Sequence, residues 1–367
     1  MIKRRLLIVD DSVVIRRSLA IALSGEPDLE IVGSAPSGRV ALMKIPMLHP
    51  DVIALDVDMP EMDGVQTLAA IRKAYPQIPV VMLSAPTERG AAATLDALTL
   101  GALDYVTKPE IGANGDERLQ ALTGELISKI RACCSDLSQD GSAGLHDVIP
   151  SWQTLRAAPS GSTKRVDIVA VGVSTGGPNA LMELLPGFPA DFPVPILIVQ
   201  HMPPTFTKLL AQRLAGRCKI CVSEADSGQQ LFPGTAWLAP GDLHMTIARE
   251  GNAVRIATWR GAPENSCRPA VDVLFRSVAQ VYASHVLAVV MTGMGQDGLR
   301  GCQQIHAAGG QVIVQDEASA IVWGMPSFVV KAGIADRIVP LPELASEILG
   351  RVRRYRSETP VIQRREL

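Results

Sequence analysis

The sequence is short of cysteine and of long apolar runs. Its 367 residues include only six cysteines, too few for a disulfide-rich scaffold of this length. Cys218 and Cys221 form a C-x-x-C pair, but no second pair accompanies them, so we expect no zinc site there. The first apolar run covers residues 6–9, and no later run approaches the ~18 residues of a membrane-spanning helix. These absences favour a soluble cytoplasmic protein with reduced thiols and no membrane insertion.

An excess of one charge sign is also missing. Lys and Arg total 35, Asp and Glu total 37, and the formal net charge is -2. A protein that binds nucleic acid mainly by releasing counterions carries a basic excess, so this balance argues against a nucleic-acid partner. Apolar residues make up 47% of the chain, which is enough for globular cores. At ~150 residues per domain, the length predicts two domains and an excess.

Short apolar runs alternate with helix-like segments in both halves of the chain. This alternation predicts parallel sheets covered by helices on both faces, and hence two doubly wound α/β domains. The predicted strands are residues 6–9, 53–55, 80–83 and 104–107, then 167–172, 195–199, 286–291 and 311–314.

The composition also suggests domain boundaries. We expect a first domain over residues 1–125, a final helix and linker over 126–164, and a second domain over 165–350. The linker prediction rests on residues 135–163, which are rich in Ser, Gly, Asp and Pro. A closing helix is predicted over residues 342–349, and residues 351–367 are expected to form a charged tail.

Polar residues end the predicted strands of the first domain. Asp10 and Asp11 follow the strand over residues 6–9 and Asp56 ends the one over 53–55; these strands are neighbours in a doubly wound sheet, so three carboxylates should converge at one sheet edge. Like charges in one place need a cation, and oxygen ligands favour Mg²⁺. Ser84 and Lys108 end two further strands and add a hydroxyl donor and a positive charge. These are the parts of a site for phosphoryl transfer to a carboxylate.

With Asp10-Asp11, LDVDMPEMDG, VMLSA and Lys108-Pro109 in this order, residues 1 to ~125 resemble a response-regulator receiver domain. The resemblance implies a flavodoxin-like fold with Asp56 as phosphoacceptor. It also implies that Asp10, Asp11 and Asp56 hold Mg²⁺, and that Ser84, Tyr105 and Lys108 transmit the switch.

Ser174 lies in VGVSTGGP, between a predicted strand and a predicted helix. Two interpretations compete: a glycine-rich turn that cradles a phosphate at a helix N-terminus, and a nucleophile elbow of the G-x-S-x-G type. A serine needs a base, and His201 follows the next strand in QHMPP. Asp297 lies in TGMGQDG, beyond another strand, where it could orient His201. The order Ser, His, Asp differs from that of α/β-hydrolases, which argues against that particular fold.

The motifs STGGP, QHMPP, APGDLHM, RPAVDVLF and TGMGQDG resemble the catalytic domain of chemotaxis protein-glutamate methylesterases. Together with the receiver, the resemblance covers nearly the whole chain and implies a Rossmann-like second domain. It implies hydrolysis of glutamyl methyl esters on methyl-accepting chemoreceptors, deamidation of receptor glutamines, and a chemotaxis histidine kinase as phosphodonor. Ser174, His201 and Asp297 then form the triad, with the backbone N–H groups of Thr175 and Met294 as oxyanion donors.

The resemblance implies no cofactor for the esterase, and we expect a monomer. His244 in APGDLHM is a second candidate base, although its match favours a structural role, and Arg268 would either contact an acidic receptor helix or support the site. The alternative function is a response regulator whose output domain binds rather than catalyses, either to DNA or as a receptor adaptor. A DNA-binding output predicts a basic helix-turn-helix after the linker, which residues 164–350 do not resemble.

Overall fold

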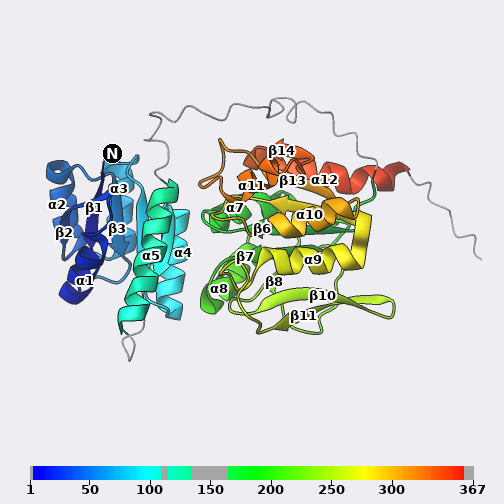
Figure 1. The fold of residues 1–367 in the computed structure, drawn as a ribbon, viewed down its shortest axis with the longest axis horizontal. Coiled ribbons are helices and arrows are strands. Elements are labelled where there is room, and N and C mark those ends of the chain that lie inside the picture. The colour runs from blue at the N-terminus through cyan, green and yellow to red at the C-terminus, as the bar shows by residue number, and fades with distance from the viewer. Residues whose placement is uncertain (1–2, 109–114, 134–163, 359–367) are drawn as a thin grey trace, which may run out of the picture. The chain divides into compact units, whose positions relative to one another are not determined.

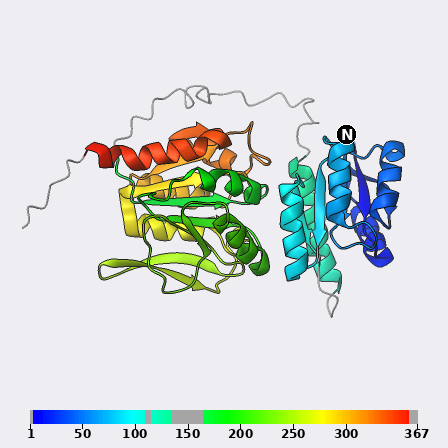
Figure 2. The same ribbon diagram turned by 180° about the vertical axis from the view of Figure 1, so that it is seen from behind.

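A computed structural model describes residues 3–108, 115–133 and 164–358 of the chain. Contacts between residues divide the chain into two units, Met1–Gly141 and Ser142–Leu367. The division falls inside the predicted final helix and linker, residues 126–164. Residues 134–163 of that range lie outside the described residues. Figures 1 and 2 show helices on both faces of the sheet in each unit, as expected for doubly wound α/β domains.

The first domain is built on a five-stranded parallel sheet in the order β2-β1-β3-β4-β5. Its strands are β1 (Arg4–Val9), β2 (Leu29–Ala35), β3 (Val52–Asp56), β4 (Val80–Ser84) and β5 (Asp104–Thr107). From β1 the chain moves outward to β2 and then crosses back to β3, so the direction changes between β1 and β3. Ligands bind at such a switch point in doubly wound sheets, outside the carboxyl ends of the strands.

Five helices of the described residues cover this sheet. They are α1 (Val13–Leu23), α2 (Gly38–Leu48), α3 (Gly64–Ala74), α4 (Glu88–Thr99) and α5 (Gly115–Cys133). Helices α1 and α5 contact each other, and their buried leucines join strand residues in one core cluster. Leu126, Ile127 and Ile130, which lie in the range that the sequence assigned to a final helix and linker, thus belong to the first domain's core.

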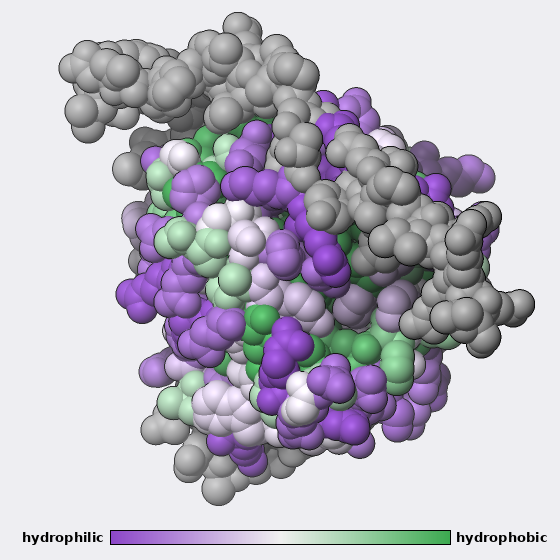
Figure 3. All heavy atoms as spheres, turned by 90° about the vertical axis from the view of Figure 1, so that its right-hand side faces the viewer, coloured by the Kyte–Doolittle hydropathy of each residue, from purple (hydrophilic) through white to green (hydrophobic). Residues whose placement is uncertain are grey.

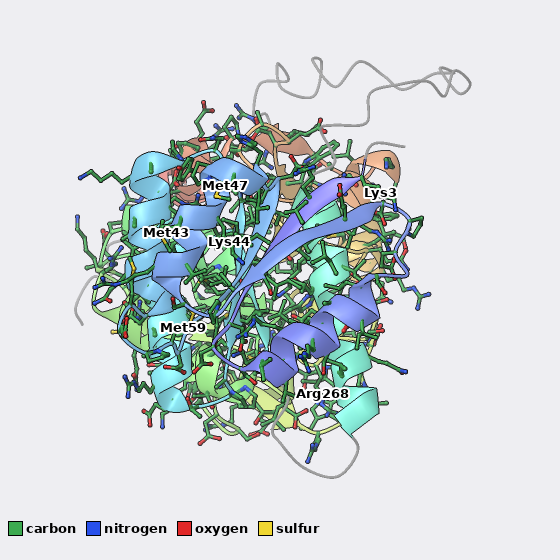
Figure 4. The ribbon with its side chains drawn as sticks, turned by 90° about the vertical axis from the view of Figure 1, so that its left-hand side faces the viewer. Lys3, Met43, Lys44, Met47, Met59 and Arg268 are labelled. Carbon is green, nitrogen blue, oxygen red and sulfur yellow. The ribbon has the colours of Figure 1, made fainter. Side chains whose placement is uncertain are left out.

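Helix α2 illustrates how the outer layer is attached. The Lys44 ammonium donates to the Ser34 carbonyl of β2 at 2.6 Å, and Figure 4 shows Lys44 on the side of the helix toward the sheet. Met43 and Met47, which are also labelled there, are 63% and 76% exposed. The helix therefore exposes two apolar side chains to solvent, which is common on protein surfaces.

The second domain is built on a seven-stranded parallel sheet in the order β14-β13-β12-β6-β7-β9-β8. Its strands are β6 (Ile168–Val173), β7 (Ile196–Gln200), β8 (Cys221–Glu224), β9 (Thr235–Leu238), β12 (Val286–Val290), β13 (Gln311–Gln315) and β14 (Arg337–Val339). The chain runs from β6 to β7 on one side and later returns to β12 on the other. The switch point of this sheet therefore lies between β6 and β12.

Within residues 164–358, an antiparallel hairpin and six α-helices surround this sheet. The hairpin is β10 (His244–Glu250) with β11 (Ala253–Trp259), and the helices are α7 (Gly177–Leu184), α8 (Pro204–Ala215), α9 (Val271–Tyr282), α10 (Leu299–Ala307), α11 (Met325–Lys331) and α12 (Leu341–Glu358). Two 3₁₀ turns, η2 (Leu185–Gly187) and η3 (Ala283–His285), lie between them. Figure 1 shows α9 beside α10 and close to the hairpin, and these elements share one core cluster.

The expectation that residues 351–367 form a tail is wrong for residues 351–358, which are helical. Helix α12 continues to Glu358, with Leu344, Ile348 and Val352 buried at four-residue spacing. Arg351 is buried too, and its guanidinium donates to Glu347 and to Gln311, each at 2.7 Å. The apolar stripe therefore extends the helix beyond the predicted domain end, because a periodic buried face outweighs the local excess of charge.

The helices and one face of the surface bear on membrane spanning. Among the described residues, every helix is too short or too polar to cross a bilayer. Figure 3 shows a face on which hydrophilic side chains are interspersed with smaller hydrophobic areas.

Candidate functional sites

Three carboxylates meet at the switch point of the first sheet. Asp10 and Asp11 follow β1, Asp56 ends β3, and β1 pairs with β3. One oxygen from each carboxylate lies within 4.8 Å of the others, with Asp10 and Asp56 buried and Asp11 exposed. The structure thus brings together the three residues that the sequence placed at neighbouring strand ends.

Lys108 reaches into this acidic pocket from the end of β5. Its ammonium lies 2.7 Å from Asp10 Oδ2 and 2.6 Å from Asp56 Oδ1. Burial raises the pKa of Asp56 to about 6, which Lys108 opposes and the Asp10 charge reinforces. Burial by itself would lower the pKa of Lys108, but Asp56 and Asp10 raise it above its ordinary value. With one ammonium paired to two of the three carboxylates, an ionised pocket keeps an excess of negative charge that a further cation would neutralise.

The three predicted switch residues lie on or next to the adjacent strands β4 and β5. The buried Ser84 hydroxyl accepts a hydrogen bond from Thr94 Oγ1 at 2.7 Å, and the Ser84 carbonyl accepts one from Lys108 N at 2.7 Å. Tyr105 is 5% exposed, and the Lys129 ammonium lies 5.0 Å from its ring centroid. Lys108 therefore contacts the acidic pocket directly and Ser84 ends the strand β4 that pairs with β3, whereas the Tyr105 ring is buried against α5.

Ser174 occupies a tight turn between β6 and α7, at the switch point of the second sheet. Its N–H donates to the Thr292 carbonyl at 3.0 Å, and its carbonyl accepts from Gln200 Nε2 at 2.9 Å. The turn needs glycine twice: Gly176 has φ of +76°, and a Cβ at Gly177 would lie 1.9 Å from Gln200 Oε1. The Gly177 N–H donates to the Ser174 carbonyl at 2.8 Å. One donor that a phosphate cradle would use is thus already occupied, which favours the nucleophile interpretation.

His201 and Asp297 form a direct pair at the ends of β7 and β12. His201 Nε2 lies 2.9 Å from Asp297 Oδ2, and His201 Nδ1 lies 3.5 Å from Cys267 Sγ. Burial by itself would lower the pKa of His201, but hydrogen bonding to Asp297 and Cys267 raises it to about 10. The Ser174 hydroxyl makes no hydrogen bond within the described part of the chain. The structure therefore joins His201 to Asp297 and leaves Ser174 unlinked to the pair.

The buried carboxylate of Asp297 is surrounded by nitrogen donors. Besides His201, it accepts hydrogen bonds from Val271 N at 2.7 Å, Asn265 Nδ2 at 2.8 Å, Asp272 N at 3.0 Å and Gly298 N at 3.0 Å. Burial would raise its pKa, but these bonds, led by the one from His201, lower the pKa below its ordinary value. Because Val271 and Asp272 begin α9, the positive end of that helix adds to the effect. Asp297 is thus held as an anion.

Sequence reasoning missed two residues of this neighbourhood, Asn265 and Cys267. Asn265 donates to Asp297 and also to Asp272 Oδ2 at 2.9 Å, so one amide links two buried carboxylates. It lies in a four-residue turn from Glu264 to Cys267, in which Asn265 and Ser266 have φ of 51° and 61°. Asparagine tolerates this left-handed conformation well, and an Asn-Ser pair was the only local signal for the turn.

The backbone N–H groups of Thr175 and Met294 are both free of partners among the described residues. Their loops are nevertheless fixed, because Thr292 Oγ1 donates to the Thr175 carbonyl at 2.9 Å and Gly293 N donates to the Val322 carbonyl at 2.9 Å. Two amides held in place without an internal acceptor suit the binding of a negative oxygen.

His244 and Arg268 have structural contacts. His244 is 1% exposed, with Nε2 lying 2.9 Å from the Ala262 carbonyl and Nδ1 accepting from Ala270 N at 3.3 Å. The Arg268 guanidinium, labelled in Figure 4, pairs with Asp242 and donates to the Gly261 carbonyl. Both ring nitrogens of His244 are therefore engaged, and Arg268 supports the chain that leads to Cys267.

An acidic pocket with one lysine, followed by a domain with a serine turn and a histidine–aspartate pair, is the arrangement expected of a response regulator with an enzymatic output domain. Residues 6–120 match the family model "Response regulator receiver domain", and residues 169–348 match "CheB methylesterase". The chain belongs to the CheB methylesterase family of response regulators.

Full-length relatives share this organisation. A protein-glutamate methylesterase/protein-glutamine glutaminase of Trichodesmium erythraeum (strain IMS101) is 54% identical over 95% of this chain and 99% of its own length. One of Nocardioides sp. (strain ATCC BAA-499 / JS614) is 44% identical over 96% of both chains. The crystal structure of the Thermotoga maritima CheB methylesterase catalytic domain is 39% identical, with a TM-score of 0.50 over 50% of this chain and 97% of that one.

Proposed function

We propose that this protein is a phosphorylation-activated esterase that hydrolyses glutamyl methyl esters on methyl-accepting chemoreceptors, releasing methanol. The relatives named protein-glutamate methylesterase/protein-glutamine glutaminase support this activity, and also the deamidation of receptor glutamines. The observation that carries the proposal is the 2.9 Å contact between His201 and Asp297, at the sheet edge that also carries the Ser174 turn.

In the proposed mechanism, Ser174 Oγ attacks the ester carbonyl and His201 takes the hydroxyl proton. Because Nε2 is bonded to Asp297, the accepting nitrogen is Nδ1. The methoxide group leaves with that proton as methanol, and water then hydrolyses the acyl-enzyme to give a glutamate carboxylate and free Ser174. With a glutamine substrate the same steps release ammonia. Rotation of the Ser174 side chain toward Nδ1 precedes the attack, since the two are not bonded at rest.

The tetrahedral intermediate carries a negative oxygen, which we assign to the N–H groups of Thr175 and Met294. Support comes from their lack of other acceptors among the described residues and from the fixed loops that hold them. Each such donor is worth roughly 3 kcal/mol in the transition state.

In the receiver, we propose Asp56 as the phosphoacceptor and Asp10, Asp11 and Asp56 as ligands of Mg²⁺. All three donors are carboxylates, the set that this hard cation prefers. The buried Asp10 Oδ2 accepts no well-oriented hydrogen bond, although the Lys108 ammonium is near, so it has capacity for a metal ion. When bound, Mg²⁺ would neutralise charge on the transferring phosphoryl group. Lys108 and Ser84 would then contact the phosphoryl oxygens and transmit the change together with Tyr105.

The proposed partners follow from this chemistry. A chemotaxis histidine kinase supplies the phosphoryl group, and the methylated helices of chemoreceptors supply the ester. Both reactions would take place in the cytoplasm, where thiols such as Cys267 stay reduced.

For regulation, we propose that the unphosphorylated receiver restricts access to Ser174 and that phosphorylation of Asp56 relieves the restriction. A chain that begins at Ser162 should then release methanol faster than the unphosphorylated full chain. Equal or slower release by a folded truncation would contradict occlusion.

The direct test is methanol release from methylated receptor membranes, with and without a small-molecule phosphodonor. Release that rises with the phosphodonor is expected. A receptor-binding adaptor without catalysis would bind the membranes and release none.

A further inference from the structure

The turn from Glu264 to Cys267 places a thiol beside Nδ1 of His201, the ring nitrogen that does not contact Asp297. Cys267 Sγ lies 3.5 Å from His201 Nδ1, and the thiol is half-buried rather than sealed in the core. Backbone hydrogen bonds between Glu264 and Cys267 close the turn in both directions, at 3.1 and 2.9 Å. The Glu264 carboxylate makes two 2.6 Å hydrogen bonds to Arg276 of α9. The thiol is therefore held in place before any ligand arrives.

The spacing of these two donors matches a tetrahedral zinc site. With Zn–N of about 2.0–2.1 Å and Zn–S of about 2.3 Å, the nitrogen and sulfur of two neighbouring ligands lie about 3.5 Å apart. The distance from His201 Nδ1 to Cys267 Sγ is 3.5 Å. A cation placed between them would need almost no rearrangement of either side chain.

The surroundings of His201 also resemble those of a metal-bound histidine. A ligating imidazole usually donates its other N–H to a carboxylate, which fixes the ring and strengthens the ligand. His201 Nε2 lies 2.9 Å from Asp297 Oδ2. One potential ligand atom from each of His201, Cys267 and Asp297 lies within 4.8 Å of the others. Two side chains that could bind the cation directly and one carboxylate that orients the histidine are thus present together.

We propose that Cys267 and His201 form a binding site for a thiophilic divalent cation such as Zn²⁺, and that the bound cation switches the esterase off. The inhibition rests on the proposed function, because Nδ1 is the nitrogen that must accept the Ser174 proton. The cation replaces the proton of the thiol and any proton on Nδ1, which are released to solvent. Solvent would complete the tetrahedron, so a chelator reverses the binding.

The site would select its cation by ligand softness. The receiver pocket offers only carboxylate oxygens, which suit Mg²⁺, whereas a thiolate and an imidazole suit Zn²⁺. Cys302 is buried, so Cys218 and Cys221 are the competing accessible thiols among the described cysteines. Burial raises the pKa of Cys218 to about 11, which disfavours its thiolate form, and no described histidine accompanies this pair.

The binding experiment uses the full chain with excess Mg²⁺, which occupies the receiver carboxylates. Co²⁺ is titrated as a coloured substitute for Zn²⁺, and the thiolate-to-cobalt absorption band is recorded. The wild type and the matched control Cys221→Ser should show the band, and Zn²⁺ should remove it. Cys267→Ser and Cys267→Ala should lack it. A band that persists in the folded Cys267 variants, or is missing from the wild type, would overturn the proposal.

The activity experiment adds Zn²⁺ to the methanol assay and compares each variant with its own rate without zinc. Loss of a direct ligand should cost more than the 10–100-fold in affinity that loss of an outer partner costs, so Cys267→Ser should tolerate more than about 100-fold more Zn²⁺. Cys221→Ser should keep wild-type sensitivity. Cobalt binding without zinc inhibition would contradict the switch. If no variant released methanol even without zinc, the proposed function would fail, while the cobalt titration would still decide the metal site.

Discussion

The two domains place a buried aspartate at the same point of the same architecture and give it opposite properties. Asp56 ends β3 at the switch point of the first sheet, and Asp297 follows β12 at the switch point of the second. Burial raises the pKa of Asp56 to about 6, whereas hydrogen bonding lowers the pKa of Asp297. The carboxyl edge of a parallel sheet thus supplies a position for a carboxylate but does not decide its charge.

The difference lies in the donors around each carboxylate. Asp297 accepts bonds from three backbone N–H groups, one amide and His201, so its charge is satisfied from within the protein. Asp56 faces Asp10 and shares Lys108 with it, and among the described residues its single backbone N–H donor is Asp58 N at 3.3 Å. These environments suit the proposed roles: a phosphoacceptor such as Asp56 must stay reactive, whereas an aspartate that orients a histidine must stay ionised and fixed.

Removing the nucleophile should have the largest effect on the second domain and none on the first. Ser174→Ala should lower kcat for methanol release by about 10⁶-fold, as loss of the nucleophile does in other serine hydrolases. Phosphorylation of Asp56 by a small-molecule phosphodonor should be unchanged. Ser223→Ala, at an exposed position of β8, is the control and should behave as wild type. Surviving methanol release in Ser174→Ala would mean that another residue attacks the ester.

Neutralising Asp297, the carboxylate with many hydrogen-bond donors, tests whether its charge controls His201. Asp297→Asn should lower kcat by about 10⁴-fold, because the imidazolium loses its counter-charge. It should also lower the pKa of His201 from about 10, so the rise of kcat/KM with pH should move to lower pH. The ring can be followed directly by NMR titration.

The control for this variant is Asp272→Asn, a neighbouring buried carboxylate that also bonds Asn265 but does not contact His201. Asp272→Asn should leave the titration midpoint of the His201 ring much closer to that of the wild type. Equal shifts in both variants would show that the pKa of His201 responds to general burial rather than to Asp297.

Neutralising the poorly satisfied carboxylate should instead stabilise its domain. The pKa of Asp56 is about 6 in the folded protein and 3.8 in the reference state, so the fold binds its proton more tightly. Folding stability then falls as pH rises from about 4 to 6, and at neutral pH Asp56→Asn should gain up to about 3 kcal/mol. Chemical denaturation without Mg²⁺ measures this gain. The variant should also lose all response to a phosphodonor, while Asp58→Asn keeps it.

The smallest expected effect comes from the amide that links two carboxylates. Asn265→Gly keeps the positive φ of this position and removes one donor from Asp297 and one from Asp272. We expect a loss of about 1–3 kcal/mol in stability and a modest fall in kcat, measured by denaturation and methanol release. Asn265→Ala should lose more stability because of backbone strain. Unchanged stability in both would show that solvent replaces the amide.

The residues that end buried strands were predictable because a run such as residues 53–55 or 286–290 has one explanation, a strand buried on both faces. The short edge strand β8 and the hairpin β10–β11 were not, since their residues are partly exposed and carry no continuous apolar run, and β14 was not, since its three residues are too few to form a pattern. The prediction ended helix α12 too early for a related reason: between its many charged residues, the buried apolar residues at four-residue spacing were not recognised.

The sequence by itself determined the order of chemical groups along the chain, and with it the alternation that creates two sheets and their polar carboxyl edges. This follows because apolar periodicity and chain connectivity are local properties. Only the tertiary structure decided that Asp297 binds Nε2 of His201, that Nδ1 is left to Cys267, and that Asp56 and Asp297 differ in pKa direction. Those outcomes depend on donors brought from distant segments, and the energy of a buried charge is set by that whole environment.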